Sequence, residues 1–257
     1  MDSILQMNKV DWKRRLLIST PTEGLIRYEW HNARSAQIIP VNWQAFGFDP
    51  MGYSVDDAYN LIVNYALFVA QTTWLMTIED DVILPPDAFK KMSQYLDSEK
   101  IPIVSGLYTT RSLPAEPLVF RGRGNGSFYN WKQGDKVWCD GVPMGFLLIH
   151  TSILKWFWEN TEEYQIYPSQ EKVHRVFETP KKIWFDPKTG EYARQEGTQD
   201  LYFFDRIMEY DVLKKTGWKQ IARRKYPFLC DTSIFCKHID RMTGKQYPIG
   251  GLPCRQS

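Results

Sequence analysis

The chain has 257 residues, of which 43% are hydrophobic and 24% are charged, a composition that is ordinary for a globular protein with a sizeable core. The formal net charge of +2 provides no global field for binding nucleic acid or a membrane surface. No stretch is apolar for long enough to span a bilayer, and the N-terminal segment lacks the apolar core of a signal peptide. These features predict a cytoplasmic protein without a membrane span.

Strands and helical patterns alternate through the first part of the chain. Ser54 and Asp57 resemble a capping box at the start of one helix, and Pro85-Pro86 opens another. A strand alternating with a helix predicts an α/β domain with a mainly parallel sheet flanked by helices. The predicted strands are residues 15–19, 74–78 and 101–104, the last closed by Ser105-Gly106, and the first of the predicted helices covers residues 55–70.

The character of the sequence changes after residue 117. Short β-type runs around the glycine-rich turn at residues 121–126 predict a smaller region of β-hairpins over residues 117–137. A strand at residues 145–149 and helices at residues 152–158 and 199–215 follow. The polar, aromatic and irregular segment at residues 161–197 predicts a mobile flap.

The four cysteines lie at Cys139, Cys230, Cys236 and Cys254. They show no CxxC spacing, so neither a disulfide framework nor a structural zinc site is indicated. Cys236 and His238 could both face a metal, but a buried free thiol at Cys236 is the interpretation we favour. The aromatic content of 15% fits stacking against sugars or bases, and it fits a large aromatic core equally well.

Three adjacent carboxylates, Glu79, Asp80 and Asp81, follow the predicted strand at residues 74–78. Because like charges repel, placing them together is unfavourable unless a cation is bound there. Mg²⁺ and Mn²⁺ take one or two carboxylates together with phosphate oxygens, and open α/β sheets bind ligands at the carboxyl ends of their strands. The cluster therefore predicts a divalent-cation site. The alternative is a solvated loop whose carboxylates cap the next helix.

The segment TWLMTIEDDVILPPDAF resembles the metal-binding segment of GT-A glycosyltransferases, in which a DxD-type motif ends a strand. The matching residues are Glu79 and Asp81 with Asp80 between them, and Glu79 departs from the commoner aspartate. The resemblance is to inverting, family 2-like members. It implies a GT-A (Rossmann-like) fold, with Asp81 as a metal ligand and with Glu79 and Asp80 on the nucleotide-sugar.

Other donor-side segments resemble the same family in the same order. LLISTPTEG resembles the first strand and the loop that holds the nucleotide base, which implicates Thr20, Pro21 and Thr22. DAYNLIVNYAL resembles the donor-side helix and implicates Asn60, and VSGLYTTRSLPAEPLVF implies that Arg111 lies near phosphates. Arg111 fits an ordinary surface arginine equally well.

The acceptor side and the catalytic residues complete the resemblance. CDGVPMGFLLIHTSIL resembles the acceptor-side segment and implicates Asp140 and Gly145, although packing alone would account for the glycine. TQDLYFFDRI resembles the xED motif that supplies the catalytic base, here Asp200. CDTSIFCKHI resembles the late strand whose histidine, here His238, completes the metal site. The alternatives are a helix-terminal charge at Asp200 and a structurally satisfied His238.

The resemblance implies one domain over residues 1–257. Residues 1–110 would form the nucleotide-sugar-binding half, and residues 111–257 the acceptor-side half with the flap at 161–197. The implied donor is a UDP- or GDP-sugar, and the implied cofactor is Mn²⁺ or Mg²⁺ on the leaving diphosphate. Asp200 would take the proton of an acceptor hydroxyl, and the reaction would invert the anomeric carbon. The acceptor itself, whether glycan, small molecule or nucleic acid, stays open.

Two further functions stay open at this point. A metal-dependent nucleotidyltransferase also uses carboxylates at strand ends, but it would need a glycine-rich loop after the first strand, where only Gly24 is present. A non-catalytic nucleic-acid-binding module could use the basic run at residues 214–225, which is interleaved with Trp218 and followed by Tyr226. A solvated helix end is the simpler interpretation of that run.

Overall fold

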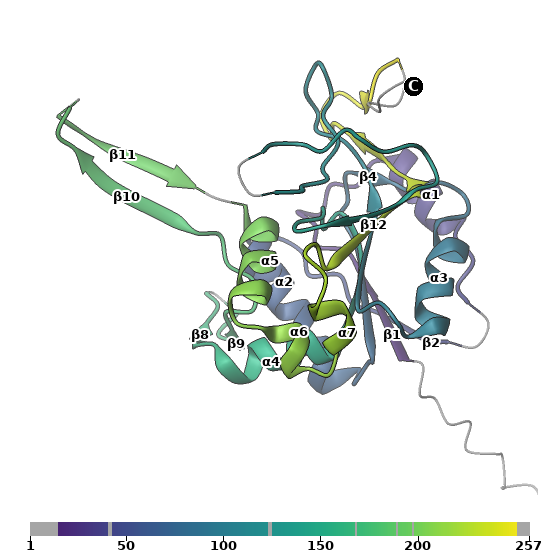
Figure 1. Cartoon of the computed structure of the whole chain (residues 1–257), viewed down its shortest axis with the longest axis horizontal. Helices are drawn as coiled ribbons and strands as arrows, with labels where there is room; N and C mark the ends of the chain where they lie inside the picture. The colour runs from purple at the N-terminus through teal and green to yellow at the C-terminus, as the bar shows by residue number, and fades with distance from the viewer. Residues whose placement is uncertain are drawn as a thin grey trace, which may run out of the picture.

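A seven-stranded mixed sheet forms the centre of the molecule (Figure 1). The computed structural model describes residues 15–40, 43–122, 125–167, 169–188, 190–196 and 198–250. The strand order is β2-β1-β3-β7-β5-β12-β6, and β7 and β6 run against the direction of the other strands. The predicted α/β class with a mainly parallel sheet is therefore confirmed. The strands are β1 Arg15–Ser19, β2 Gln44–Gly47, β3 Trp74–Ile78, β5 Ile103–Leu107, β6 Lys136–Cys139, β7 Phe146–His150 and β12 Phe228–Phe235.

Helices cover both faces of this sheet (Figure 1). Side chains alternate between two buried clusters, so that Leu17 packs beneath α2, α4 and α5 while Leu16 and Ile18 pack beneath α1 and α3. This alternation gives each strand two apolar faces, as a sheet covered on both sides requires. The helices are α1 Tyr28–Ser35, α2 Val55–Asn64 with its π-helical continuation Tyr65–Val69, α3 Ala88–Ser98, α4 Thr151–Asn160, α5 Gln199–Glu209, α6 Val212–Lys215 and α7 Lys219–Ala222.

Two predicted boundaries are wrong. Ser105 and Gly106 do not close a strand but lie inside β5, where the Ser105 hydroxyl donates to the carbonyl of Pro143 at 2.8 Å. Gly106 is required because a Cβ there would lie 2.9 Å from the ring of Phe146. The single helix predicted over residues 199–215 is divided into α5 and α6 by Asp211, whose φ of 52° is left-handed.

The region predicted to form hairpins over residues 117–137 pairs more sparsely than expected. Among the residues described there, only single bridges such as Phe120 with Ser127 occur ahead of β6. A three-stranded sheet of order β14-β13-β4 lies beside the main one, with β4 at Val82–Ile83, β13 at Lys237–Ile239 and β14 at Gln246–Tyr247. This small sheet carries the late histidine to the end of β3.

The segment at residues 161–197 was predicted to be irregular, but it forms two antiparallel hairpins. The first pairs β8 Glu163–Gln165 with β9 Lys172–His174 and packs against α2. The second pairs β10 Lys181–Asp186 with β11 Glu191–Glu196 and projects from the body of the molecule (Figure 1). Local strand pairing thus supplies the regular structure that the sequence pattern did not indicate. The predicted mobility of this segment stays a prediction.

The cysteines agree with the prediction of free thiols. Cys139, Cys230 and Cys236 are free and buried, and Cys254 lies outside the described residues. Among the described residues, no helix combines the length and the apolar character that crossing a bilayer requires.

Candidate active site

The three acidic residues follow β3 at the carboxyl end of the sheet, as expected, and their side chains take different partners. β3 is fully buried through Ile78, and the turn at residues 79–81 then leads into β4. Asp80 is completely buried and Asp81 is 6% exposed. Carboxylates this deeply buried need hydrogen bonds or cations to remain ionised.

Asp80 is held between the loop after β1 and the C-terminal part of the chain. The hydroxyl of Thr22 donates to Oδ2 at 2.6 Å, and Nη2 of Arg241 lies 2.5 Å from Oδ1. Arg241 also pairs with Glu23, at 3.4 Å. Burial raises the pKa of Asp80, and Thr22 and Arg241 only partly offset this effect. The loop of Thr20, Pro21 and Thr22 therefore contacts the acidic cluster through the Thr22 hydroxyl. The backbone N–H of Thr20 donates instead to Asp49, at 2.7 Å.

Asp81 faces His238 and Arg111. Strand β13 pairs His238 with Val82 of β4, and this register places Nε2 of the imidazole 3.2 Å from Oδ2 of Asp81. Nη1 of Arg111 lies 3.2 Å from the same oxygen. Burial alone would raise the pKa of Asp81, but His238, Arg111 and Arg241 together lower it below its ordinary value. The predicted metal ligands, far apart in the sequence, are therefore neighbours.

The hydrogen bonds of this pair fit a divalent cation. Nδ1 of His238 is 2.8 Å from the carbonyl oxygen of Thr109, which can only accept, so Nδ1 carries a proton and Nε2 is the ring nitrogen that faces Asp81. Oδ1 of Asp81 is buried and has no hydrogen-bond partner among the described residues. The part of the chain that the structure describes contains no group of three or more His, Cys, Asp or Glu that could hold a metal. Asp81 and His238 could together supply two ligands, a number that Mg²⁺ or Mn²⁺ can complete with water and phosphate oxygens.

Glu79 points to a third environment, under helix α2. The hydroxyl of Tyr59 lies 3.1 Å from Oε1, and the indole N–H of Trp30 donates to the Glu79 carbonyl at 2.8 Å. Burial, reinforced by the charges of Asp81 and Asp200, raises the pKa of Glu79 to about 8. This shift favours the protonated form of Glu79, in which the group can donate a hydrogen bond and adds no negative charge to the cluster.

Asp200 lies in the first turn of α5, as predicted, and its charge acts on the same environment. Its Oδ1 accepts from the backbone N–H of Leu201 at 2.9 Å. The charge of Asp200 contributes, after burial, to raising the pKa values of Glu79, Tyr59 and Tyr108. A helix N-terminus stabilises a carboxylate at this position. The structure thus brings Asp200 to the Glu79 side of the acidic cluster.

Gly145 lies in the same environment, where it makes close packing possible. Its N–H donates to the hydroxyl of Tyr108 at 3.0 Å, and its carbonyl accepts from the Glu79 N–H at 2.9 Å. A Cβ at this position would lie 2.5 Å from the Tyr108 oxygen and 2.7 Å from Val82. Packing therefore explains this glycine without an acceptor.

Two other predicted residues have structural partners away from the cluster. Asp140 accepts the N–H of Gly122 at 2.9 Å and so supports the backbone at that residue. Asn60 is 1% exposed, and its side chain bonds both the N–H and the carbonyl of Phe177, at 2.8 and 2.9 Å, and the hydroxyl of Tyr164 at 3.0 Å. Both N–H groups of the Asn60 amide are therefore occupied within the protein.

Three residues at the site were missed by the sequence interpretation: Tyr59, Tyr108 and Arg241. Tyr59 and Tyr108 belong to apolar runs and look like core residues in the sequence. Arg241 follows β13 in a segment without periodicity, so no local pattern indicates that it reaches Asp80. Only the pairing of β13 with β4 brings that segment to the acidic cluster.

Comparisons with known proteins give distant likenesses only. No family model and no curated protein matches the sequence. Among solved structures, A197 from STIV shares 16% identity with a TM-score of 0.49, over 88% of this chain and 87% of that one. S. aureus TarS 1–349 in complex with UDP-GlcNAc shares 9% identity with a TM-score of 0.36, over 59% of this chain and 48% of that one.

A third solved structure, a glycosyltransferase involved in the glycosylation of the major capsid of PBCV-1, shares 13% identity with a TM-score of 0.30. The likeness covers 57% of this chain and 66% of that one. Of the TarS chain in complex with UDP-GlcNAc, this protein spans about half the length.

Proposed function

We propose that this protein is a divalent-metal-dependent glycosyltransferase of the GT-A type, which moves a sugar from a UDP- or GDP-sugar to an acceptor hydroxyl. The observation that carries the proposal is the pair formed by Asp81 and His238 at the carboxyl end of β3, with Oδ1 of Asp81 buried and unpartnered among the described residues. Ligands of open α/β sheets bind at this edge.

Asp81 and His238 would hold Mn²⁺ or Mg²⁺, and the hydrogen bond from Nδ1 to Thr109 fixes the imidazole for that role. A cation bound there would neutralise the charge of the leaving diphosphate. Arg111 pairs with Asp81 and Arg241 with Asp80, and their side chains, 44% and 29% exposed, are available to phosphate oxygens. Thr22 and Glu79 would contact the nucleoside and sugar, as the family resemblance implies.

Asp200 would act as the general base on the acceptor hydroxyl. It approaches the cluster from α5, whereas the metal ligands come from the small sheet, so base and leaving group are supplied by different elements. A single base placed opposite the leaving group gives inversion at the anomeric carbon, by analogy with inverting glycosidases. The proposed site thus combines residues from positions 1–110 with residues from positions 111–257.

Donor hydrolysis tests the proposal. Incubation with UDP- and GDP-sugars and Mn²⁺ is expected to release nucleoside diphosphate slowly, whereas formation of nucleoside triphosphate and sugar 1-phosphate when pyrophosphate is added would favour a nucleotidyltransferase. Asp81→Asn removes the anionic ligand and is expected to weaken metal-dependent binding of nucleoside diphosphate by at least about tenfold, the effect of losing one charged contact. Calorimetry with and without EDTA measures this change.

Asp97→Asn provides a matched control, since Asp97 is an exposed carboxylate on α3. This variant is expected to bind UDP and GDP as the unaltered protein does. Equal affinities of Asp81→Asn and the unaltered protein, each unaffected by EDTA, would contradict the metal-dependent proposal.

A further inference from the structure

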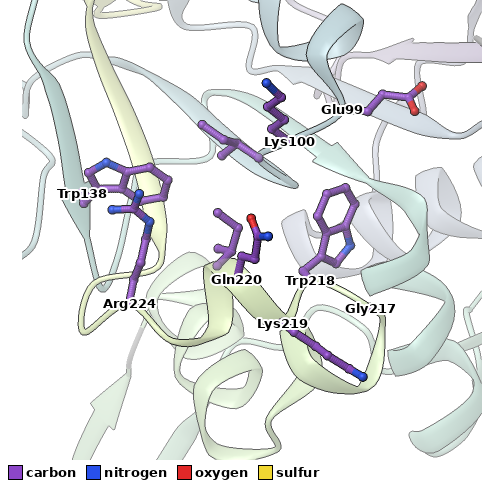
Figure 2. A pocket seen from close by; sticks show the side chains of 10 residues that line it. Glu99, Lys100, Trp138, Gly217, Trp218, Lys219, Gln220 and Arg224 are labelled. Carbon is purple, nitrogen blue, oxygen red and sulfur yellow. The ribbon is translucent and has the colours of Figure 1, made fainter.

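A hollow of about 650 Å³ is lined by residues of α7 and of the segments around it (Figure 2). Its walls come from the segments that precede β5 and β12 and from β6, so it faces the amino ends of the parallel strands. This volume is within the range of ligand sites in proteins. None of the residues assigned above to metal, donor or base lines it.

Two indole rings stand on either side of this hollow (Figure 2). Trp138, on β6, is half-buried, and the guanidinium of Arg224 lies over its ring at 3.8 Å from the centroid. Trp218 is anchored by its N–H, which donates to Ser152 at 3.1 Å, and by an edge contact with the ring of His150 at 5.1 Å. Fixed aromatic and guanidinium planes are surfaces on which flat rings stack at little entropic cost.

Positive charge surrounds these rings. Lys100, Lys219 and Arg224 line the hollow, against one acid, Glu99. A smaller hollow of about 170 Å³ shares Arg224 and is lined in addition by two lysines and one acid. Those residues are Lys214, Lys225 and Asp211. The excess of cations is local, because the whole chain carries a net charge of only +2.

We propose that these two adjoining hollows form a groove for single-stranded nucleic acid. The cations, spread over both hollows, suit a chain of phosphates, and the indole and guanidinium planes suit unstacked bases. An anionic polysaccharide matches the charges but brings no aromatic ring. The groove uses residues apart from the acidic cluster, so it stands or falls independently of the glycosyltransferase assignment.

Fluorescence anisotropy with a labelled oligo-dT of about twelve nucleotides, a length in the site range of single-strand binders, tests the charge. The double variant Lys100→Glu/Lys219→Glu is expected to bind at least about tenfold more weakly. Each lost phosphate contact lowers the slope of log affinity against log salt by about 0.7, hence by about 1.4 for two contacts. Lys90→Glu/Lys172→Glu changes the net charge equally outside the groove and is expected to bind as the unaltered protein does.

The role of the rings is tested with an abasic strand of the same length and with hyaluronate as competitor. The abasic strand is expected to bind at least about tenfold more weakly than oligo-dT, since stacking of one base on an aromatic ring contributes about 1–3 kcal/mol. Equal binding of the abasic strand, displacement by hyaluronate at equal charge, or equal affinities of the two double variants would each overturn the proposal. Thermal unfolding of all variants separates these outcomes from loss of the fold.

Discussion

At the residue scale, the site depends on what each acid contacts rather than on the number of acids. Glu79, Asp80 and Asp81 are adjacent in the sequence, yet each has different partners. Glu79 contacts a tyrosine, Asp80 a threonine and an arginine, and Asp81 a histidine and another arginine. Burial raises the pKa values of Glu79 and Asp80, whereas nearby cations lower that of Asp81. Asp81 is therefore the member of the cluster best suited to bind a metal ion.

Asp200→Asn tests the assignment of the base. The amide cannot accept the acceptor proton, so turnover is expected to fall by about two to four orders of magnitude. The proposed metal and donor contacts lie on other elements, and affinity for nucleoside diphosphate is therefore expected to stay within about twofold. Kinetics with the donor that the hydrolysis assay identifies measure the turnover, and calorimetry measures the affinity. Near-normal turnover of the variant would exclude Asp200 as the base.

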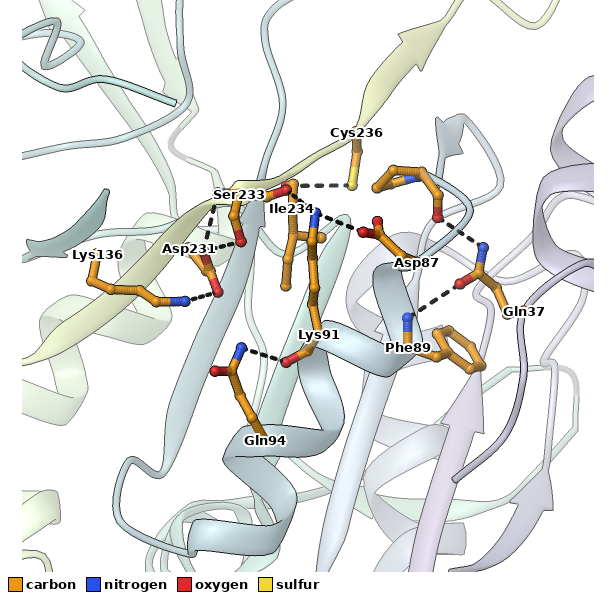
Figure 3. A network of polar contacts seen from close by, with 11 residues as sticks. Gln37, Asp87, Phe89, Lys91, Gln94, Lys136, Asp231, Ser233, Ile234 and Cys236 are labelled. Atoms are coloured by element: carbon orange, nitrogen blue, oxygen red, sulfur yellow. Dashed lines mark hydrogen bonds and ion pairs between the residues drawn. The ribbon is translucent and has the colours of Figure 1, made fainter. Parts of the chain in front are cut away.

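Asp231 provides a test of stability away from the site (Figure 3). Its buried carboxylate pairs with Lys136 and accepts from the hydroxyl of Tyr95 at 2.7 Å and from Ser233 at 2.7 Å. Burial alone would raise the pKa of Asp231, but Lys136, Ser233 and Tyr95 lower it below 3.8. Its contribution to stability is therefore present above that value and is lost as the pH falls through the pKa of the folded state.

Asp231→Asn is expected to lower the free energy of unfolding at pH 7 by about 2 kcal/mol, because the carboxylate is buried and hydrogen-bonded while its ionic partner Lys136 is 43% exposed and screened by solvent. The loss of stability between pH 7 and pH 3 is expected to be smaller in the variant than in the unaltered protein. Urea unfolding across this range measures both quantities. Parallel pH profiles of the two proteins would show that Asp231 is not the group responsible.

At the scale of elements, Asn60 joins helix α2 to the segment after β9. It replaces strand pairing there by bonding both the N–H and the carbonyl of Phe177. Asn60→Ala leaves these two buried backbone groups unpaired and is expected to destabilise the fold by about 2 kcal/mol or more. Urea unfolding and hydrogen exchange of the Phe177 amide measure this. An unchanged stability with a raised Kd for donor would instead support the donor-binding role that the sequence resemblance implies.

At the scale of the whole molecule, two hairpins replace the irregular flap that the sequence pattern indicated. Hairpin β8–β9 is tied to α2, whereas β10–β11 projects from the body (Figure 1). Proteases are expected to cut first in the β10–β11 hairpin, and less readily with nucleotide and Mn²⁺ present if it closes over the donor. Limited proteolysis with mass spectrometry locates the cut, and equal cleavage in both conditions would contradict a lid.

Local patterns in the sequence determined the elements whose residues decide their own conformation. The apolar run of β3 and the cap of Ser54, whose hydroxyl accepts from Asp57 N–H at 3.3 Å, are examples. The acidic cluster and the placement of Asp200 in a first turn were predicted for the same reason, because strand ends and helix starts are marked by nearby residues.

Tertiary structure alone decided which distant side chains complete the site and which polar groups serve the core. His238 and Arg241 reach the acids through pairing of β13 with β4, a contact between segments separated by more than half the chain. In the sequence Asn60 looks like a donor-binding amide, but in the fold its side chain is hydrogen-bonded to the backbone of Phe177. Pairing between distant segments depends on register and burial summed over the whole molecule, and no window of sequence contains that information.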